Sequence, residues 1–282
     1  MSLPVFEILV PEVYLRIQGK QSSWIRDAPT NDDLEAVRQA GIGDSTFDPL
    51  GLRSTLFHNL QTNQAELQCR VLLGPVKAKV LIVSPRGQRP AIPWSLWAKI
   101  FLAFGKSHTA NGMWRIVLYA SSAKRRFPPK GQQPGQEHVN GGYAIPNNPG
   151  SIVIYREEEC TRVLVHELLH ACGSDDFNNS EEMREVLTES WAELFLIAIQ
   201  ANGSVRKAKQ LWKEQAQWIA NQEFVLRNEH NVNLPSDYAW RYTVGRRDVF
   251  QESGLHIPEP SPFPRAALMN SLRFTTPLLA PL

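Results

Sequence analysis

The sequence predicts an α+β protein in which a small mixed or antiparallel sheet precedes a helical C-terminal half. Two observations predict this class. Short runs rich in β-branched and aromatic residues, separated by glycine and proline, fill much of residues 66–156. From about residue 157 onward, apolar residues recur with the 3.6-residue period of amphipathic helices. Strands that come first and helices that follow are typical of α+β folds.

The predicted strands share dense apolar and β-branched residues and are bounded by turn residues. They cover residues 66–73, 77–84, 113–121, 141–145 and 151–156. Gly74-Pro75 separates the first two strands, and residues 146–150 separate the last two. One helix is expected among them, over residues 93–105, because proline is favoured in the first turn of a helix and glycine at its end.

Three longer helices are expected after the strands. The first runs from about residue 157 to 172 and ends at Gly173, since glycine readily adopts the left-handed conformation of a C-terminal cap. The second begins after Asn179 or Ser180, both favourable N-cap residues. The third begins after Ser204 and carries apolar residues at helical spacing.

The chain is predicted to have three parts. Residues 1–60 form an N-terminal region that contains a short helix over 31–40. This region could be an assembly arm, a separate lobe or a propeptide. Residues 61–255 carry the regular strands and helices and form the main domain. Residues 256–282 form a Pro-rich tail, which we expect to wrap a surface or reach a partner.

Composition narrows the classes of partner. The net charge is only +2 and the basic clusters are short, so no nucleic-acid partner is expected. No apolar run approaches 18 residues and the N-terminus lacks a basic region before its apolar stretch, so neither a membrane span nor a signal peptide is expected. Three cysteines form no disulfide framework and favour a reducing compartment. We therefore expect a cytoplasmic protein, with association with a virion left open.

The stretch VLVHELLHACG, residues 163–173, places titratable side chains inside an apolar helix. Such groups are costly to bury unless they are paired or bind something. His166, Glu167 and His170 share one helical face, so both imidazoles can reach a single ion while the glutamate reaches a water on it. The structural alternative is two satisfied histidines beside a buried glutamate.

A catalytic zinc ion needs a third protein ligand and one open position. Glu189, on the next predicted helix, is the favoured third ligand because that helix is strongly apolar. Glu193 lies one turn further on and is positioned to accept the other N–H of a ligand histidine. The rival ligand is Asp176, which follows Gly173 in an HExxHxxGxxD pattern. Each of these carboxylates could instead be a solvated surface residue.

These residues resemble the active-site helices of the gluzincins, the group of zinc metallopeptidases that includes thermolysin and the zinc aminopeptidases. Residues 166–170 match HExxH, and the gap of eighteen residues (171–188) before Glu189 matches the spacing of the zinc aminopeptidases. Residues 188–192, TESWA, are similar to the Asn-Glu-Gly-Phe-Ala stretch of that group. The resemblance covers residues 150–200. It implies a zincin-like fold, Zn²⁺ held by His166, His170 and Glu189, and Glu167 as the general base.

The resemblance also suggests how substrate would be held. In the family, an edge strand pairs with extended substrate, and residues 141–145, followed by 151–156, are the candidate edge here. A tyrosine or histidine from the C-terminal half stabilises the oxyanion, and the candidates are Tyr238, Tyr242 and His230. The Gly-Ala-Met-Glu-Asn motif of the aminopeptidases is absent from the sequence, so endopeptidase activity is favoured.

The function predicted from the sequence is zinc-dependent hydrolysis of a peptide bond in a peptide or protein substrate. Zinc lowers the pKa of its bound water towards about 7, and Glu167 takes the proton and passes it to the leaving amine. One alternative is a structural or assembly protein, for example in a viral particle, that keeps the fold and docks through its N-terminal region and tail. The intact Glu167 argues against a dead site. The other alternative is a zinc enzyme that acts on a non-peptide bond.

Overall fold

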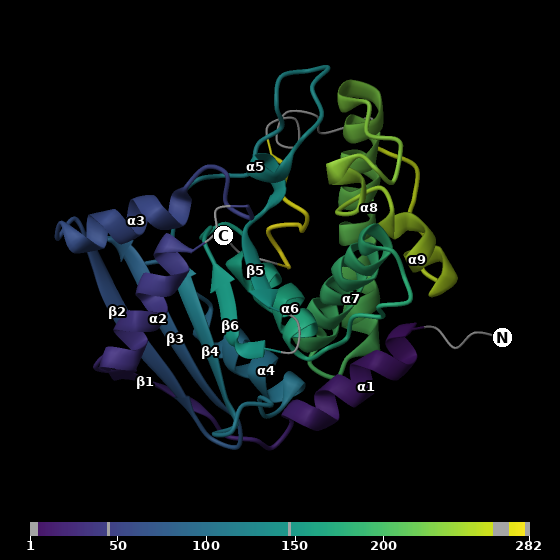
Figure 1. Ribbon diagram of the computed structural model, residues 1–282. Coiled ribbons are helices and arrows are strands. Elements are labelled where there is room, and N and C mark those ends of the chain that lie inside the picture. Colours follow the sequence, from purple (N-terminus) through teal and green to yellow (C-terminus); the bar gives the residue numbers. More distant parts are fainter. Residues whose placement is uncertain (1–4, 44–45, 146–147, 262–270, 280–282) are drawn as a thin grey trace. The chain divides into compact units, whose positions relative to one another are not determined.

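A computed structural model describes residues 5–43, 46–145, 148–261 and 271–279 (Figure 1). It confirms the α+β class, with one six-stranded mixed sheet and several helices among the described residues. Contacts divide the chain into two compact units. The sheet unit contains residues 16–123 and 140–174, and the helical unit contains residues 1–15, 124–139 and 175–281.

The sheet has the strand order β1-β2-β3-β4-β6-β5. The strands are β1 (Ser23–Asp27), β2 (Ala65–Leu73), β3 (Lys77–Pro85), β4 (Met113–Tyr119), β5 (Gly142–Ile145) and β6 (Asn148–Ile154). The first three strands form an antiparallel meander, whereas β3, β4 and β6 run parallel. Strand β5 returns antiparallel to β6 and forms one edge of the sheet. The five predicted strands are confirmed, although Pro146 and Asn147 of the predicted turn lie outside the described residues.

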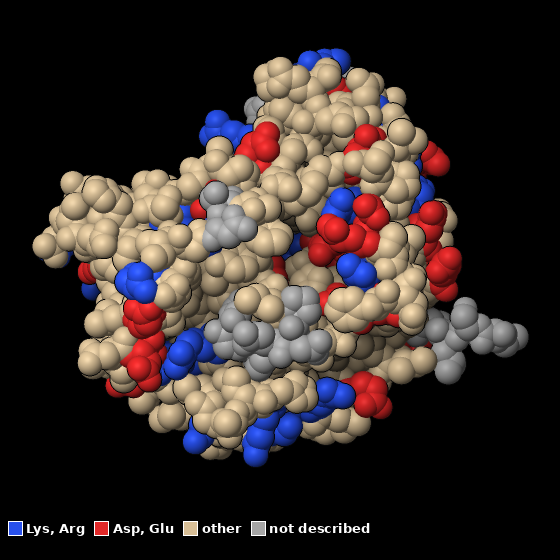
Figure 2. Space-filling view, in the orientation of Figure 1, with Lys and Arg blue, Asp and Glu red and all other residues tan. Residues whose placement is uncertain are grey.

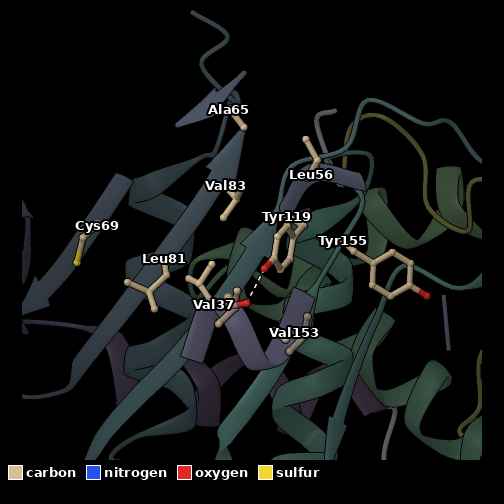
Figure 3. Packing of buried hydrophobic residues seen from close by; sticks show 11 residues of the cluster. Val37, Leu56, Ala65, Cys69, Leu81, Val83, Tyr119, Val153 and Tyr155 are labelled. Carbon is tan, nitrogen blue, oxygen red and sulfur yellow. Dashed lines mark hydrogen bonds between the residues drawn. The ribbon is translucent and has the colours of Figure 1, made fainter. Parts of the chain in front are cut away.

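Helices α2 (Asn31–Ile42) and α3 (Leu52–Gln61) cover one face of the sheet (Figure 1). Their buried side chains, including Val37 and Leu56, pack against alternate residues of the strands (Figure 3). The hydroxyl of Tyr119 on β4 donates a hydrogen bond to the carbonyl oxygen of Val37 at 2.6 Å. A Cβ at Gly41 of α2 would lie 2.6 Å from that hydroxyl, so only glycine allows this close approach of helix and sheet.

The other face of the sheet is also buried. The intervening strand residues Val80, Ile82, Ile116 and Leu118 are no more than 2% exposed. Helix α6 (Cys160–Ala171) contacts β5 and β6 there, and α4 (Trp94–Phe104) joins α6 through a 2.9 Å hydrogen bond from Trp97 Nε1 to a threonine hydroxyl on α6. Burial on both faces explains why the central strands are continuous apolar runs in the sequence.

Much of the N-terminal region is folded onto the sheet. The predicted helix over 31–40 is α2, and Thr30 forms a capping box with Asp33 at its start. Helix α3 was not predicted. Its first turn is capped by Asp48, whose carboxylate accepts hydrogen bonds from the backbone N–H groups of Leu52 at 3.1 Å and Arg53 at 2.9 Å.

The helical unit is built around two long helices. Its elements are most of α1 (Val5–Ile17), α5 (Gln136–Val139), α7 (Glu181–Ala201), α8 (Val205–His230), the 3₁₀ helix η1 (Tyr238–Trp240) and α9 (Arg246–Glu252). Ser204 caps α8 as predicted, and Ser180, rather than the alternative Asn179, caps α7; each accepts a hydrogen bond from a backbone N–H in the first turn.

The described part of the Pro-rich tail returns to α8. The side chain of Gln215 on α8 makes two hydrogen bonds to this segment. Its Nε2 donates to the carbonyl oxygen of Phe274 at 2.8 Å, and its Oε1 accepts from the backbone N–H of Thr276 at 2.9 Å. Trp218 donates to the carbonyl oxygen of Arg273 at 2.9 Å. Residues 271–276 are therefore part of the helical unit's packing.

The surface carries both signs of charge. On the face shown in Figure 2, acidic and basic side chains are interspersed and most of the surface belongs to other residues. The charge total in the sequence, 30 basic against 28 acidic residues, agrees with this mixture. Among the described residues, no helix combines the length and the apolar character needed to cross a bilayer.

Candidate metal centre

Helix α6 is terminated on both sides by left-handed residues. It follows Glu159, which has φ 59° and is fully buried. At its other end Gly173 has φ 71°. The N–H of Gly173 donates to the carbonyl oxygen of His170 at 2.9 Å, and the N–H of Ser174 donates to that of Leu169 at 3.2 Å. This pair of bonds is the Schellman motif, so the predicted helix end at Gly173 is confirmed.

The two histidines of α6 direct the same ring nitrogen at each other. His166 Nε2 and His170 Nε2 are 3.0 Å apart, and the ring centroids are 4.6 Å apart at an interplanar angle of 73°. His166 is 7% exposed, while His170 is partly exposed. Two nitrogens bound at 2.0–2.1 Å to one tetrahedral zinc ion are about 3.3 Å apart. The pair therefore fits two ligands of a single ion.

Glu167 lies between the histidines in sequence and beside the edge strand in space. It is 4% exposed. A Cβ at Gly142 of β5 would lie 3.3 Å from Glu167 Oε1 and 2.6 Å from Val163 Cγ1 of α6. Helix α6 therefore packs directly on the backbone of β5, and the missing side chain at Gly142 leaves room for the carboxylate. The predicted general base and the predicted substrate strand are neighbours in the sheet unit.

Glu189 and Glu193 lie on α7 in the helical unit. Glu189 is 2% exposed and Glu193 is fully buried, so neither is a solvated surface residue. Glu193 Oε2 accepts a hydrogen bond from Arg246 Nη1 at 2.8 Å, and neither side chain of this ion pair is exposed. Arg246 is thus one partner of Glu193, and the contact with a ligand histidine suggested by the sequence stays a prediction.

Asp176 lies in an exposed turn of the helical unit. Its Oδ1 accepts from the backbone N–H of Asn178 at 3.0 Å and from the Asn178 side chain at 2.8 Å. Its Oδ2 accepts from Asn179 Nδ2 at 3.2 Å. Hydrogen bonds that an aspartate accepts from residues two and three positions later stabilise a turn. This arrangement favours a turn role for Asp176 over the role of third ligand.

The side chain of His230 is buried at the end of α8, where it packs against neighbouring residues. It is 3% exposed, and its Nδ1 is 2.7 Å from the carbonyl oxygen of Gln132. Its ring stacks on Phe127 with centroids 5.0 Å apart and an interplanar angle of 7°. These contacts favour a structural role for His230 over a role at the oxyanion.

Tyr238 and Tyr242 form a pair in the helical unit. Their hydroxyl oxygens are 3.2 Å apart. Burial, followed by the charge of Glu185 and the neighbouring Tyr238, raises the pKa of Tyr242 well above 10. Tyr242 therefore keeps its phenolic proton at neutral pH and remains a hydrogen-bond donor.

Sequence reasoning overlooked Glu185. This residue lies one turn before Glu189 on α7, and its negative charge contributes to the raised pKa of Tyr242. Its carboxylate is among the groups able to ligate a metal. The four-residue spacing that aligned Glu189 with Glu193 also aligns Glu185 with Glu189, so the same pattern would have found it.

The candidate site residues of the sheet unit are therefore His166, Glu167 and His170 on α6. The helical unit carries the candidate carboxylate ligands Glu185 and Glu189 on α7, followed one turn later by Glu193. Comparison with known proteins adds no relative to this description: no family model, no curated protein and no solved structure matches the chain.

Proposed function

We propose that the protein is a zinc-dependent metallopeptidase, and more specifically an endopeptidase. The observation that carries the proposal is the pair of Nε2 atoms 3.0 Å apart on α6, with the buried Glu167 between His166 and His170 in the same turn. A pair of satisfied structural histidines would not require a carboxylate beside an edge strand. The HExxH sequence and the resemblance to gluzincins support the same function.

His166, His170 and Glu189 would hold the ion. Two imidazoles and one carboxylate are a ligand set of catalytic zinc sites, and they leave one position open. The burial of Glu189 on an apolar helix supports its choice over Asp176, which is exposed. When bound, zinc polarises a carbonyl oxygen and lowers the pKa of a coordinated water.

Glu167 is the general base in this proposal. Its carboxylate takes a proton from the attacking water and delivers it to the leaving amine. The edge strand β5, which lies beside Glu167, would orient an extended substrate by main-chain hydrogen bonds. Tyr238 and Tyr242 are the candidate donors to the oxyanion, because a phenol keeps its proton at neutral pH and can donate a hydrogen bond.

The first test is metal content, measured by elemental mass spectrometry on the purified full chain. We expect about one zinc per chain in the wild type. The His166→Ala variant should lose it, because one of the two imidazole ligands is gone. A wild type that binds no zinc, with a melting temperature unchanged by added zinc, would contradict the proposal and favour a structural protein.

The second test separates the roles of the carboxylates. Glu167→Gln should keep zinc but lower the rate of peptide cleavage by about 10²–10⁴-fold, since it removes only the base. Glu189→Ala should lose zinc, whereas Asp176→Ala should keep it. Zinc loss in the Asp176 variant alone would move the third ligand to that residue, and full activity of Glu167→Gln would exclude the mechanism.

A further inference from the structure

We propose that the sheet unit binds a small amphipathic anion in a cavity beside α4. The anion combines an apolar body with one phosphate or carboxylate group. The cavity has a volume of about 660 Å³, and its walls come from residues within 17–23, from the end of β2 with Gly74, and from one side of α4. Small-molecule sites in proteins have volumes of this size. We call this cavity the α4 pocket. The inference goes beyond the proposed peptidase activity and does not depend on it.

Two hydrogen bonds fix α4 beside the pocket. Arg16 Nη1, near the end of α1, donates to the carbonyl oxygen of Ala103 at 3.3 Å. Trp24 Nε1 on β1 donates to the carbonyl oxygen of Trp94 at 2.8 Å, and the centroids of these two indole rings are 4.7 Å apart. The last turn of α4 is thus joined to α1 and its first turn to β1. The wall formed by α4 is therefore in place before a ligand arrives, and a preformed site loses little conformational freedom on binding.

A glycine after β2 allows a second wall of the pocket to form. Gly74 has φ 145°, and a Cβ there would lie 2.8 Å from the carbonyl oxygen of Gln21. Only glycine therefore lets the connection between α1 and β1 lie against the turn between β2 and β3. Lys20 and Ser22, on either side of Gln21, line the pocket. This close backbone contact holds that part of the connection at the pocket.

The lining of the α4 pocket combines buried apolar residues with more exposed polar ones. Ile17, Ala98 and Leu102 are no more than 8% exposed. The polar part of the lining includes the exposed Lys20, the partly exposed Lys99 and three serines. An amphipathic anion matches this division, because its apolar body can cover the buried side chains while the ammonium groups contact its charged end.

The chain around the pocket lacks negative charge. Among the described residues, no acidic side chain lines the α4 pocket. Residues 67–136, which include the turn after β2 and all of α4, contain twelve lysine and arginine residues and no aspartate or glutamate. Residues 13–26, which form the wall on the other side, contain three basic residues and no acidic one. Basic side chains also predominate along the lower border of the face in Figure 2, where Figure 1 shows the chain between α1 and β1. A cleft surrounded by one sign of charge attracts ligands of the opposite sign.

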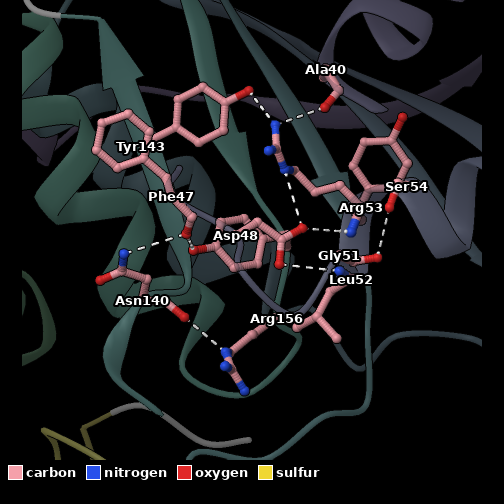
Figure 4. A network of polar contacts seen from close by, with 12 residues as sticks. Ala40, Phe47, Asp48, Gly51, Leu52, Arg53, Ser54, Asn140, Tyr143 and Arg156 are labelled. Atoms are coloured by element: carbon pink, nitrogen blue, oxygen red, sulfur yellow. Dashed lines mark hydrogen bonds and ion pairs between the residues drawn. The ribbon is translucent and has the colours of Figure 1, made fainter. Parts of the chain in front are cut away.

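Lys20 differs from the buried cations of the same unit, which have acidic partners. Arg53 pairs with Asp48 at 3.3 Å (Figure 4), and Lys79 pairs with Asp33 at 2.9 Å. Lys20 makes no ion pair with any residue that the structure describes. A phosphate or carboxylate in the α4 pocket therefore meets an ammonium group for which no carboxylate of the described chain competes.

The test titrates octyl phosphate, below its micelle concentration, into the purified full chain by isothermal titration calorimetry. We expect a Kd at least about tenfold lower than that of inorganic phosphate or of octanol, since each of these compounds offers only half of the ligand. Lys20→Gln and Lys99→Gln should each raise the Kd about tenfold, because each removes a charge that contacts the anion. Lys77→Gln is the matched control and should leave the Kd unchanged, because Lys77 is an exposed lysine at the start of β3 that does not line the pocket.

Filling the pocket provides a second test. Ser95 is exposed on α4 and lines the pocket. Ser95→Phe should abolish binding of octyl phosphate and leave the melting temperature close to that of the wild type, because the ring occupies the pocket without removing a buried contact. The inference would be overturned by absence of binding, by inorganic phosphate or octanol binding as tightly as octyl phosphate, by equal effects of Lys20→Gln and Lys77→Gln, or by wild-type binding in Ser95→Phe. None of these measurements involves peptide cleavage, so failure of the proposed peptidase function would not produce them.

Discussion

At the scale of single residues, the helical unit contains an ion pair with no exposed surface, Glu193 with Arg246. Removing one charge of a buried ion pair is strongly destabilising, because the remaining charge loses its ionic partner. Glu193→Gln should therefore lower the free energy of unfolding by about 3–5 kcal/mol, measured by urea denaturation. Glu35→Gln, which breaks the exposed pair with Arg38, is the control and should leave the midpoint close to that of the wild type. Equal urea midpoints for Glu193→Gln and Glu35→Gln would contradict a stabilising role for the buried ion pair.

Single residues also show what the sequence could predict about the site. His166, Glu167 and His170 were identifiable because one helical turn brings them together, and helical geometry is local. Arg246 was not identifiable as the partner of Glu193, since 53 residues separate them and only the folded chain joins them. Glu185 was overlooked for a different reason, because the spacing in the gluzincins directed attention to Glu189 and to the residues that follow it on the same helix.

At the scale of elements, α2 is tied to β3 by Asp33 and Lys79, whose charged atoms are 2.9 Å apart. Burial by itself would raise the pKa of Asp33, but hydrogen bonds from Lys79 and Thr30 more than offset burial and hold the pKa below its ordinary value of 3.8. A carboxyl whose pKa is lowered by folding stabilises the fold above the unfolded-state pKa. That stability is lost as the pH falls through the folded-state pKa.

Asp33→Asn should therefore cost about 2–3 kcal/mol at pH 7, as expected for hydrogen bonds to a charged group. The difference from wild type should begin to shrink as the pH falls below about 4, the unfolded-state pKa, and should continue to shrink towards the lower folded-state pKa. Urea midpoints measured from pH 7 to pH 3 check this. Asp32→Asn, at the exposed neighbouring position, should show little difference at any pH. A constant difference across the range would exclude the ionised pair as the cause.

Elements with their own local signals were predicted, and the others were not. Helices α7 and α8 carry serine caps, and α6 ends in a glycine, so their limits follow from nearby residues. Helix α3 was missed because its cap is Asp48, which reaches its N–H groups from outside the usual N-cap position, occupied here by Gly51. Strand β1 was missed because it is short and largely exposed, and its stabilising contacts, the pairing with β2 and the packing of Trp24 on α4, are distant in sequence.

At the scale of the whole molecule, the three cysteines are all free thiols. Burial raises the pKa of Cys160 to about 12, and it also raises that of Cys69. Because only the thiolate is alkylated, Cys160 in the native protein at pH 8 should react with iodoacetamide at least about a hundredfold more slowly than in protein unfolded in guanidinium, and Cys69 should also react more slowly. Site-resolved mass spectrometry measures both rates. Fast labelling of either residue in the native protein would contradict this burial.

The division into two units has a consequence for how the chain is made. The sequence passes from one unit to the other at residues 15/16, 123/124, 139/140 and 174/175, so neither unit is a continuous stretch. A ribosome releases the sheet unit's last segment only after part of the helical unit has already emerged. The helical unit in turn waits for residues 271–276, which pack on α8. The last described segment of the sheet unit thus emerges before residues 271–276 of the helical unit, and no single contiguous gene segment encodes either unit.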